Sequence, residues 1–287
     1  MTNLFKAFLF KLRRDLTFRI TLFIGLGIAV LMTLIYLGID LGMKALAEQV
    51  SEGTDEPYKF MFCTGQNLFI SSLSPAQNFG IAIPVNLISF TVLEFTQGTI
   101  RNKIIAGNSK TKIYFSLILS GLVFTFALII TYSLLCLGLG SIFGGFDING
   151  TTTSGSLNTE FFWKLVVLSI TAYILITVGT IFFATLLRNI GPCIPIVILL
   201  ILGCYLVSTI FSAVAMLGDE VEFIKTATEL LKYLNPLHSI ASYASSIGGD
   251  KLEIKNDAFI AEIINNLVYT GLFLGFGLLI FKKRDVK

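Results

Sequence analysis

Charged residues are scarce in this 287-residue chain, in which Asp, Glu, Lys and Arg together make up 14% of the sequence. Soluble domains carry about 25%. Apolar residues make up 54%, including 26 phenylalanines, and the mean hydropathy is +0.82. This composition excludes an ordinary soluble domain and predicts a polytopic membrane protein. We expect the lipid bilayer to be its main partner and expect no nucleic-acid partner.

The usual catalytic and cofactor motifs are also missing. The sequence has no G-x-x-x-x-G-K-[ST], H-E-x-x-H or G-x-S-x-G pattern, so it has no P-loop for a nucleotide. Its single histidine, His238, lies outside the apolar runs, and its four cysteines form no C-x-x-C pair. We therefore expect neither an enzyme nor a metal site, and no cofactor bound by this chain itself.

Six apolar runs dominate what is present, and each approaches or exceeds the ~20 residues needed to cross a bilayer. They predict an all-α membrane protein with a single transmembrane domain over residues 1–287. The expected spans lie at about 16–39, 74–94, 113–139, 161–187, 192–217 and 259–281. The second is expected to begin at Ser74-Pro75, a capping residue followed by proline in the first helical turn.

Two amphipathic segments lie outside these spans. Residues 1–15 place apolar side chains at helical spacing among Lys and Arg, which favours a helix on the membrane surface over a simple basic flank. Residues 218–257 are too long for a turn and contain an amphipathic pattern that Asn235-Pro236 would end. They predict outer helices, which either dip into the membrane over an exit or rest on the outer leaflet.

The distribution of charge predicts the orientation. With the N-terminus inside, the inner segments hold 14 basic and three acidic residues, and the outer segments hold seven basic and 15 acidic residues. Lys and Arg in short loops near span ends favour the cytoplasmic side. We expect a multi-pass protein of the bacterial cell membrane with both termini in the cytoplasm.

One basic connector, residues 94–116, stands out between the second and third runs. Gly98 and Gly107 permit sharp changes of direction. Residues 99–106 can form a short helix between them. Such a helix, joined directly to two spans, would be a lever on which a soluble partner acts. The alternative is an inner loop that only satisfies the charge rule.

The connector reads E-F-T-Q-G-T-I-R-N-K-I-I-A-G-N-S-K-T-K-I-Y-F-S. It resembles the segment between the second and third spans of type-2 ABC exporter permeases, in particular Gram-positive permeases associated with peptide export and antimicrobial-peptide resistance. Those permeases tend to show an acidic residue, then G-T-[IL]-R-N-K, a small residue, and a basic residue before I-Y-x-S. Lys110 stands where arginine is common, which keeps the charge but loses the planar guanidinium.

The resemblance implies a membrane subunit that pairs with a second copy or a paralogue and with two ATPase subunits, which bind ATP and magnesium. Segment 99–110 would be the coupling helix that docks on the ATPase. The docking residues would be Thr99, Ile100, Arg101, Asn102, Lys103, Ile104, Ile105, Gly107 and Lys110. Glu94, Gly98, Lys112 and Tyr114 would support them.

The phenylalanine-rich interior favours an amphipathic peptide as cargo, of the toxin, bacteriocin or lantibiotic type. Drug, lipid or sodium export by the same architecture is the alternative within this class, and a non-transporting membrane scaffold or sensor is the alternative outside it. Four asparagines in the spans are candidates for a translocation path: Asn78, Asn86, Asn265 and Asn266. Amide side chains also join helices in membranes, and we favour that role for them.

Overall fold

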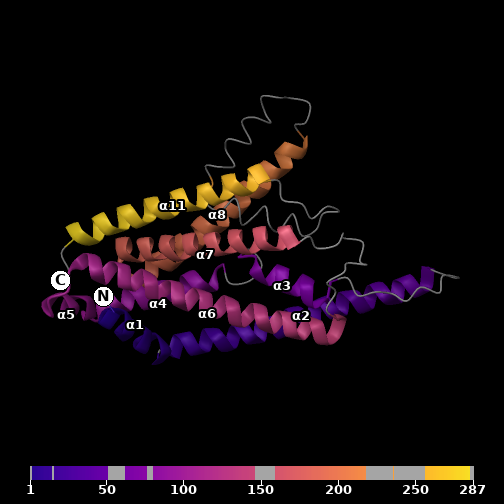
Figure 1. Ribbon diagram of the computed structural model, residues 1–287, viewed down its shortest axis with the longest axis horizontal. Coiled ribbons are helices and arrows are strands. Elements are labelled where there is room, and N and C mark those ends of the chain that lie inside the picture. Colours follow the sequence, from indigo (N-terminus) through magenta and orange to yellow (C-terminus); the bar gives the residue numbers. More distant parts are fainter. Residues whose placement is uncertain are drawn as a thin grey trace.

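The computed structural model describes residues 2–14, 16–50, 62–75, 80–145, 159–217, 235 and 256–284. The regular elements within these residues are all helices (Figure 1). They are α1 (Thr2–Arg14), α2 (Leu16–Val50), α3 (Gly65–Leu73), α4 (Ala82–Thr96), α5 (Thr99–Ile105), α6 (Lys110–Gly144), α7 (Thr159–Leu187), α8 (Ile190–Leu217) and α11 (Asn256–Lys283).

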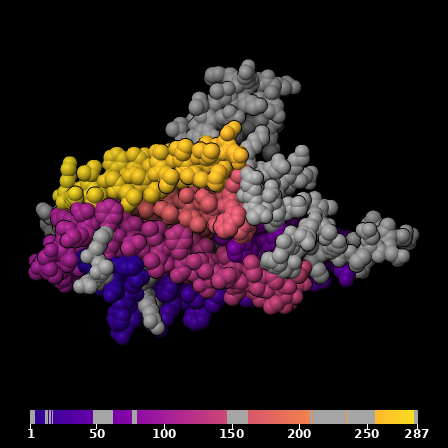
Figure 2. Space-filling model, in the orientation of Figure 1, coloured from indigo at the N-terminus to yellow at the C-terminus, as the bar shows by residue number. Residues whose placement is uncertain are grey.

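Five of these helices are long and apolar enough to cross a membrane, which confirms the prediction of an all-helical, multi-pass membrane protein. They are α2, α6, α7, α8 and α11. They run roughly along the long axis of the molecule, and both ends of the chain lie at the end that carries α5 (Figure 1). In the space-filling view, α11 lies along the surface of the bundle above α7 and α6 (Figure 2).

The N-terminal segment is a separate helix, as predicted for residues 1–15. Leu4 and Phe8 face the bundle and are 8% and 1% exposed, whereas Phe10 on the opposite side is 59% exposed. The guanidinium of Arg14 lies 4.4 Å from the centre of the Phe10 ring. The exposed side of α1 therefore carries both an apolar and a cationic group.

The predicted second span, residues 74–94, is wrong at its start. Ser74 ends α3 instead of beginning a helix, and α4 begins only at Ala82. The residue before a proline is pushed out of the helical region, and Ser74 has ψ of 119°. That conformation fits the end of a helix as well as the expected N-cap, and it is the packing of Gly65 against α6 that places Ser74-Pro75 at the end of α3.

Among the remaining boundaries, the end of the first span differs even more, because α2 continues to Val50 instead of ending near residue 39. α2 and α6 extend beyond the spans predicted at 16–39 and 113–139, while α7, α8 and α11 agree with the last three to within a few residues. The outer helices predicted for 218–257 lie outside the described residues, apart from Asn235 and the start of α11.

α3 packs very closely against the C-terminal half of α6. A Cβ added to Gly140 would stand only 2.8 Å from the Cα of Gly65 and 2.8 Å from Cδ1 of Leu68. The amide of Gly65 also donates to the carbonyl of Gly145, at 3.1 Å. Small residues are what allow two membrane helices to approach in this way.

This contact predicts that alanine substitutions at two neighbouring glycines of α6 affect stability differently. Gly140→Ala should lower the free energy of unfolding by about 1–3 kcal/mol, the usual cost of overpacking, because the new methyl group meets the α3 backbone. Gly138→Ala is the matched control, since nothing lies within 4 Å of its added Cβ, and alanine favours the helix by up to about 1 kcal/mol. Thermal unfolding in detergent measures both, and equal effects would contradict the close packing.

Candidate functional site

The connector between α4 and α6 is a helical turn closed by glycine at both ends. Gly98 and Gly107 have φ of 66° and 84°, a region that glycine enters without the penalty of a Cβ. Ser109 is the N-cap of α6 and accepts from the amide of Lys112. The seven residues of α5 are thereby separated from both flanking helices.

Glu94, in the last turn of α4, holds this connector in place. Its side chain is fully buried. Lys11 of α1 donates to Oε1 and Lys103 of α5 donates to Oε2, both at 2.6 Å. The hydroxyl of Thr99 contacts the same residue twice, at 2.7 Å from Oε2 and 2.8 Å from the main-chain oxygen. One carboxylate therefore joins α1, α4 and α5.

Aromatic contacts surround this ion-pair network. The ammonium of Lys103 lies 3.4 Å from the centre of the Phe8 ring, and Phe8 packs against Phe90 with ring centres 6.3 Å apart. Lys11 lies 6.0 Å from the Phe90 ring and also donates to Gln97. A cation between a carboxylate and an aromatic face is stabilised from both sides.

The environment of Lys103 lowers its pKa below the ordinary value. Burial disfavours the charged ammonium and is the main cause. The charge of Lys11 adds to it, while the hydrogen bond and charge of Glu94 oppose it. The network is therefore compact, with two cations sharing a single carboxylate.

The side of α5 that faces away from the bundle is solvent-exposed. Arg101, Asn102 and Ile105 are exposed, and the side chain of Ile105 is 73% exposed. Ile100, by contrast, is 0% exposed and belongs to the core. The helix thus has an anchored side and an outer side that combines a cation, an amide and an aliphatic group.

The predicted docking residues therefore divide into two groups. Thr99, Ile100 and Lys103 anchor α5 to the bundle, and Arg101, Asn102 and Ile105 face outward, while Ile104 is half-buried. The prediction that the helix continues to Lys110 is wrong, because Ala106 ends α5 and Lys110 begins α6. The positive φ of Gly107 is the physical reason.

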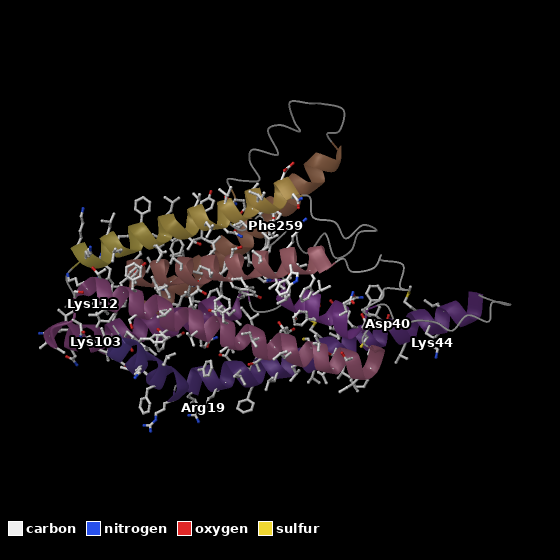
Figure 3. The ribbon with its side chains drawn as sticks, viewed as in Figure 1. Arg19, Asp40, Lys44, Lys103, Lys112 and Phe259 are labelled. Atoms are coloured by element: carbon white, nitrogen blue, oxygen red, sulfur yellow. The ribbon has the colours of Figure 1, made fainter. Side chains whose placement is uncertain are left out.

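Lys110 and the two supporting residues of α6 have different roles. Lys110 donates to the carbonyls of Lys282 and Arg284 at the end of α11, where helix carbonyls favour a cation. Lys112 is exposed and lies near Lys103 at the α5 end, opposite the end that carries Asp40 and Lys44 (Figure 3). Tyr114 is 0% exposed, and its ring packs 5.5 Å from that of Phe281.

Two of the predicted path asparagines join helices, and a third bonds a main-chain carbonyl outside the described helices. Asn86 accepts from Thr21 of α2 at 2.7 Å, and Asn266 donates to Thr171 of α7 at 3.1 Å. Asn265 donates to the carbonyl of Asn235 at 3.3 Å. The structure does not bring these three residues together, and Asn78 lies outside the described residues.

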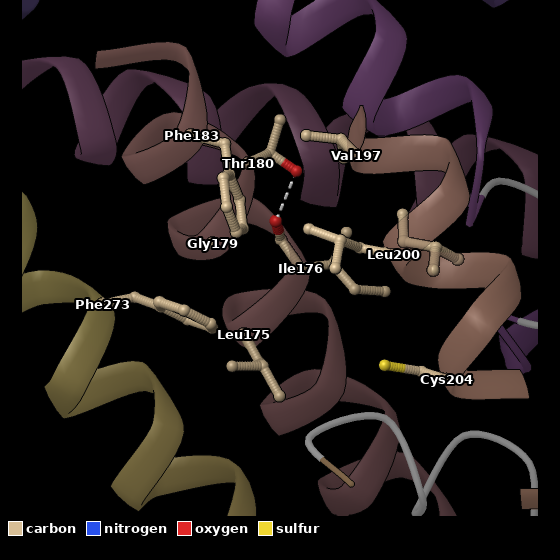
Figure 4. A pocket seen from close by; sticks show the side chains of 10 residues that line it. Leu175, Ile176, Gly179, Thr180, Phe183, Val197, Leu200, Cys204 and Phe273 are labelled. Atoms are coloured by element: carbon tan, nitrogen blue, oxygen red, sulfur yellow. Dashed lines mark hydrogen bonds between the residues drawn. The ribbon is translucent and has the colours of Figure 1, made fainter. Parts of the chain in front are cut away.

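An apolar cavity of about 120 Å³ lies between α7, α8 and α11 (Figure 4). Its walls include Leu175, Phe183, Leu200 and Phe273, and the thiol of Cys204 points toward it. The hydroxyl of Thr180 is turned to the carbonyl of Ile176, at 2.7 Å. The space is therefore suited to an aliphatic or aromatic group.

Sequence reasoning missed two important contacts. Lys11 is one of several cations in the amphipathic surface helix predicted for residues 1–15, and no pattern selects it among the neighbouring cations as the partner of Glu94. Asp40 directly follows the first predicted span, 16–39, and is 0% exposed, where it accepts from the amides of Phe62 and Cys63, at 3.0 Å and 2.7 Å. Glu94 and Asp40 each stand at the end of an apolar run. This position is the one sequence signal that their carboxylates need a partner.

Comparison with known proteins identifies one family. Neither the curated proteins nor the solved structures give a significant match to this chain. A family of proteins of unknown function, DUF2705, matches residues 28–287, which is most of the chain and includes the whole connector between α4 and α6. The chain therefore belongs to the DUF2705 family.

Proposed function

We propose that this chain is the membrane-spanning permease subunit of an ATP-binding cassette exporter. The observation that carries the proposal is α5, a short helix fixed to the bundle through Glu94 and exposed along Arg101, Asn102 and Ile105. A helix anchored in this way would transmit a push from a soluble partner to α1 and α4 together. In this proposal ATP and magnesium bind to a separate ATPase subunit, two copies of which act on a pair of permeases.

The proposed architecture has six crossings. α3 and α4 follow one another alongside α6, since Gly65 lies beside Gly140 and Leu87 lies beside Gly121. Together they would form the second crossing, broken near its middle, in addition to the five long helices. The second permease, a copy or a paralogue, would cover apolar helix surface such as that of α2, where Phe23, Ile24 and Leu31 are all more than half exposed.

The cargo that fits best is an amphipathic peptide of the toxin, bacteriocin or lantibiotic type. The cavity between α7, α8 and α11 is lined mainly by aliphatic and aromatic side chains. Such walls suit an apolar side chain better than a sugar or an ion. Export of a drug or a lipid would use the same surface chemistry.

The proposed location is the bacterial cell membrane with both termini in the cytoplasm. The α5 end carries the ends of the chain and the cations of α6 and α11, as the charge rule requires of a cytoplasmic face (Figures 1 and 3). Single cysteines in place of Lys283 and Glu52 test this orientation. In intact cells an impermeant thiol reagent should label only the second, and the reverse pattern would invert the topology.

Ile105 and Arg101 provide the test of docking. Ile105→Ser and Arg101→Ala should each leave insertion intact, and Ile105→Ser should weaken ATPase binding by about tenfold or more, because burial of an isoleucine is worth about 1.5–3 kcal/mol. Co-purification of the ATPase subunit and its cargo-stimulated ATP hydrolysis measure the effect.

The matched control is Ile142→Ser, because Ile142 is 76% exposed on the same long helix that follows α5 but lies at its opposite end. It should bind the ATPase as the unmodified chain does. If no ATPase co-purifies with the unmodified chain, a non-transporting scaffold or sensor becomes the better account. The same holds if Ile105→Ser and Arg101→Ala couple to ATP hydrolysis as well as the control does.

A further inference from the structure

Three helices meet at the end of the bundle that carries α5. The guanidinium of Arg284, directly after α11, donates to the carbonyl of Leu186 in the last turn of α7. Only Arg188 and Asn189 separate α7 from the start of α8. The ends of α7 and α11 and the start of α8 are therefore neighbours, and the apolar cavity lies between the same three helices (Figure 4).

This meeting point is rich in positive charge. Lys282, Lys283 and Arg284 are exposed at the end of α11, and Lys110 donates to the carbonyls of Lys282 and Arg284, at 3.0 Å and 3.1 Å. From residue 282 onward the sequence reads K-K-R-D-V-K, with four cations and one acid. Of the acids that the structure describes, only Glu94 lies at the α5 end, and lysines of α1 and α5 already contact it. We name Lys110, Lys282, Lys283 and Arg284 the cation cluster.

The cavity lies at the depth of lipid acyl chains below this cluster. Among its lining residues, Phe183 and Leu175 are four and twelve residues from the end of α7, and Phe273 is ten residues from the end of α11. At the rise of an α-helix these separations correspond to about 6–18 Å. Each leaflet contributes about half of a hydrocarbon core ~30 Å thick. The cavity therefore coincides in depth with the acyl chains of the leaflet on the α5 side.

The cavity is apolar and reaches the surface of the bundle. Leu200 of α8 lines it and is 45% exposed, and the neighbouring Leu199 is 67% exposed. The hydroxyl of Thr180 is already bonded to the carbonyl of Ile176. The volume of about 120 Å³ approaches that of the cavity of about 150 Å³ that takes up benzene. The space therefore fits a short length of hydrocarbon chain that enters from the bilayer.

We propose that α7, α8 and α11 bind an anionic phospholipid, with its phosphate at the cation cluster and part of one acyl chain in the cavity. Basic sites between membrane helices recognise anionic headgroups. A charged cluster above an apolar cavity also reproduces the order of headgroup and chain in a phospholipid. The proposal does not rest on the exporter function, and the acyl chain would compete with an apolar cargo group for the cavity.

The headgroup is tested with two lipids that share their acyl chains. The full chain in a neutral detergent is titrated with dioleoylphosphatidylglycerol or with dioleoylphosphatidylcholine, and native mass spectrometry measures the bound lipid. The anionic lipid should bind at least about tenfold more tightly, because the choline headgroup cancels the phosphate charge. Lys282→Gln/Lys283→Gln should remove most of this preference.

A charge-matched control separates a site from general attraction to a basic protein. Lys6→Gln/Arg19→Gln also removes two exposed cations, from α1 and α2, and Arg19 lies on the side of the bundle away from α11 (Figure 3). This variant should bind the anionic lipid as the unmodified chain does. Equal binding of the two lipids by the unmodified chain, or equal losses in the two double variants, would overturn the proposal.

The acyl chain is tested by filling the cavity from its exposed rim. Leu200→Trp should weaken binding of phosphatidylglycerol by about tenfold or more, because the larger side chain takes the place of several buried methylenes. Leu199→Trp is the matched control, since Leu199 is more exposed and does not line the cavity. Thermal unfolding without added lipid confirms that both variants fold.

Two further outcomes would contradict the proposal. Equal binding by the two tryptophan variants would show that no acyl chain enters the cavity. Displacement of the lipid by a similar concentration of soluble glycerol phosphate would assign the cation cluster to a free phosphate compound. All of these measurements use the chain without an ATPase, so failure of the lipid site and failure of the exporter proposal are distinguishable.

Discussion

A buried carboxylate at the end of an apolar helix has to be neutralised, and the structure around α5 follows from how this is done for Glu94. Leaving such a charge unpaired would cost several kcal/mol. Lys11 and Lys103 satisfy it from α1 and α5, and Thr99 donates a third hydrogen bond. The N-terminal helix and the short connector are therefore attached to the same point of α4, which is why an outside force on α5 would reach three helices.

At the opposite end of the bundle a second buried carboxylate, Asp40, is satisfied by two main-chain amides, which fixes the chain just before α3. The close contact of Gly65 with Gly140 then holds α3 against α6, and Pro75 ends α3 well inside the bundle. Ser74 and Pro75 at the end of α3 and Gly80 just before α4 are all buried, so the described ends of these two helices lie within the bundle.

The sequence predicted most of the helical architecture because long apolar runs need only counting. It also predicted a short helix in the connector, since Gly98 and Gly107 mark the turns at which that helix begins and ends. It failed where a tertiary contact decides the outcome. Ser74-Pro75 has the same letters at the start or the end of a helix, and only the packing of Gly65 against α6 places it at the end. Likewise, no pattern distinguishes Lys11 from Arg13 or Arg14 as the partner of Glu94.

The central claim is that Glu94 and Lys103 couple α4 and α5 energetically, and a double-mutant cycle measures this most directly. Glu94→Gln, Lys103→Met and the double variant are compared by thermal unfolding in detergent, with Lys110→Met as the second cation that Glu94 does not contact. We predict an interaction energy for Glu94 and Lys103 within the range of about 0.5–3 kcal/mol found for contacting residues. The Glu94 and Lys110 pair should be additive. Additivity for Glu94 and Lys103 as well would contradict the account.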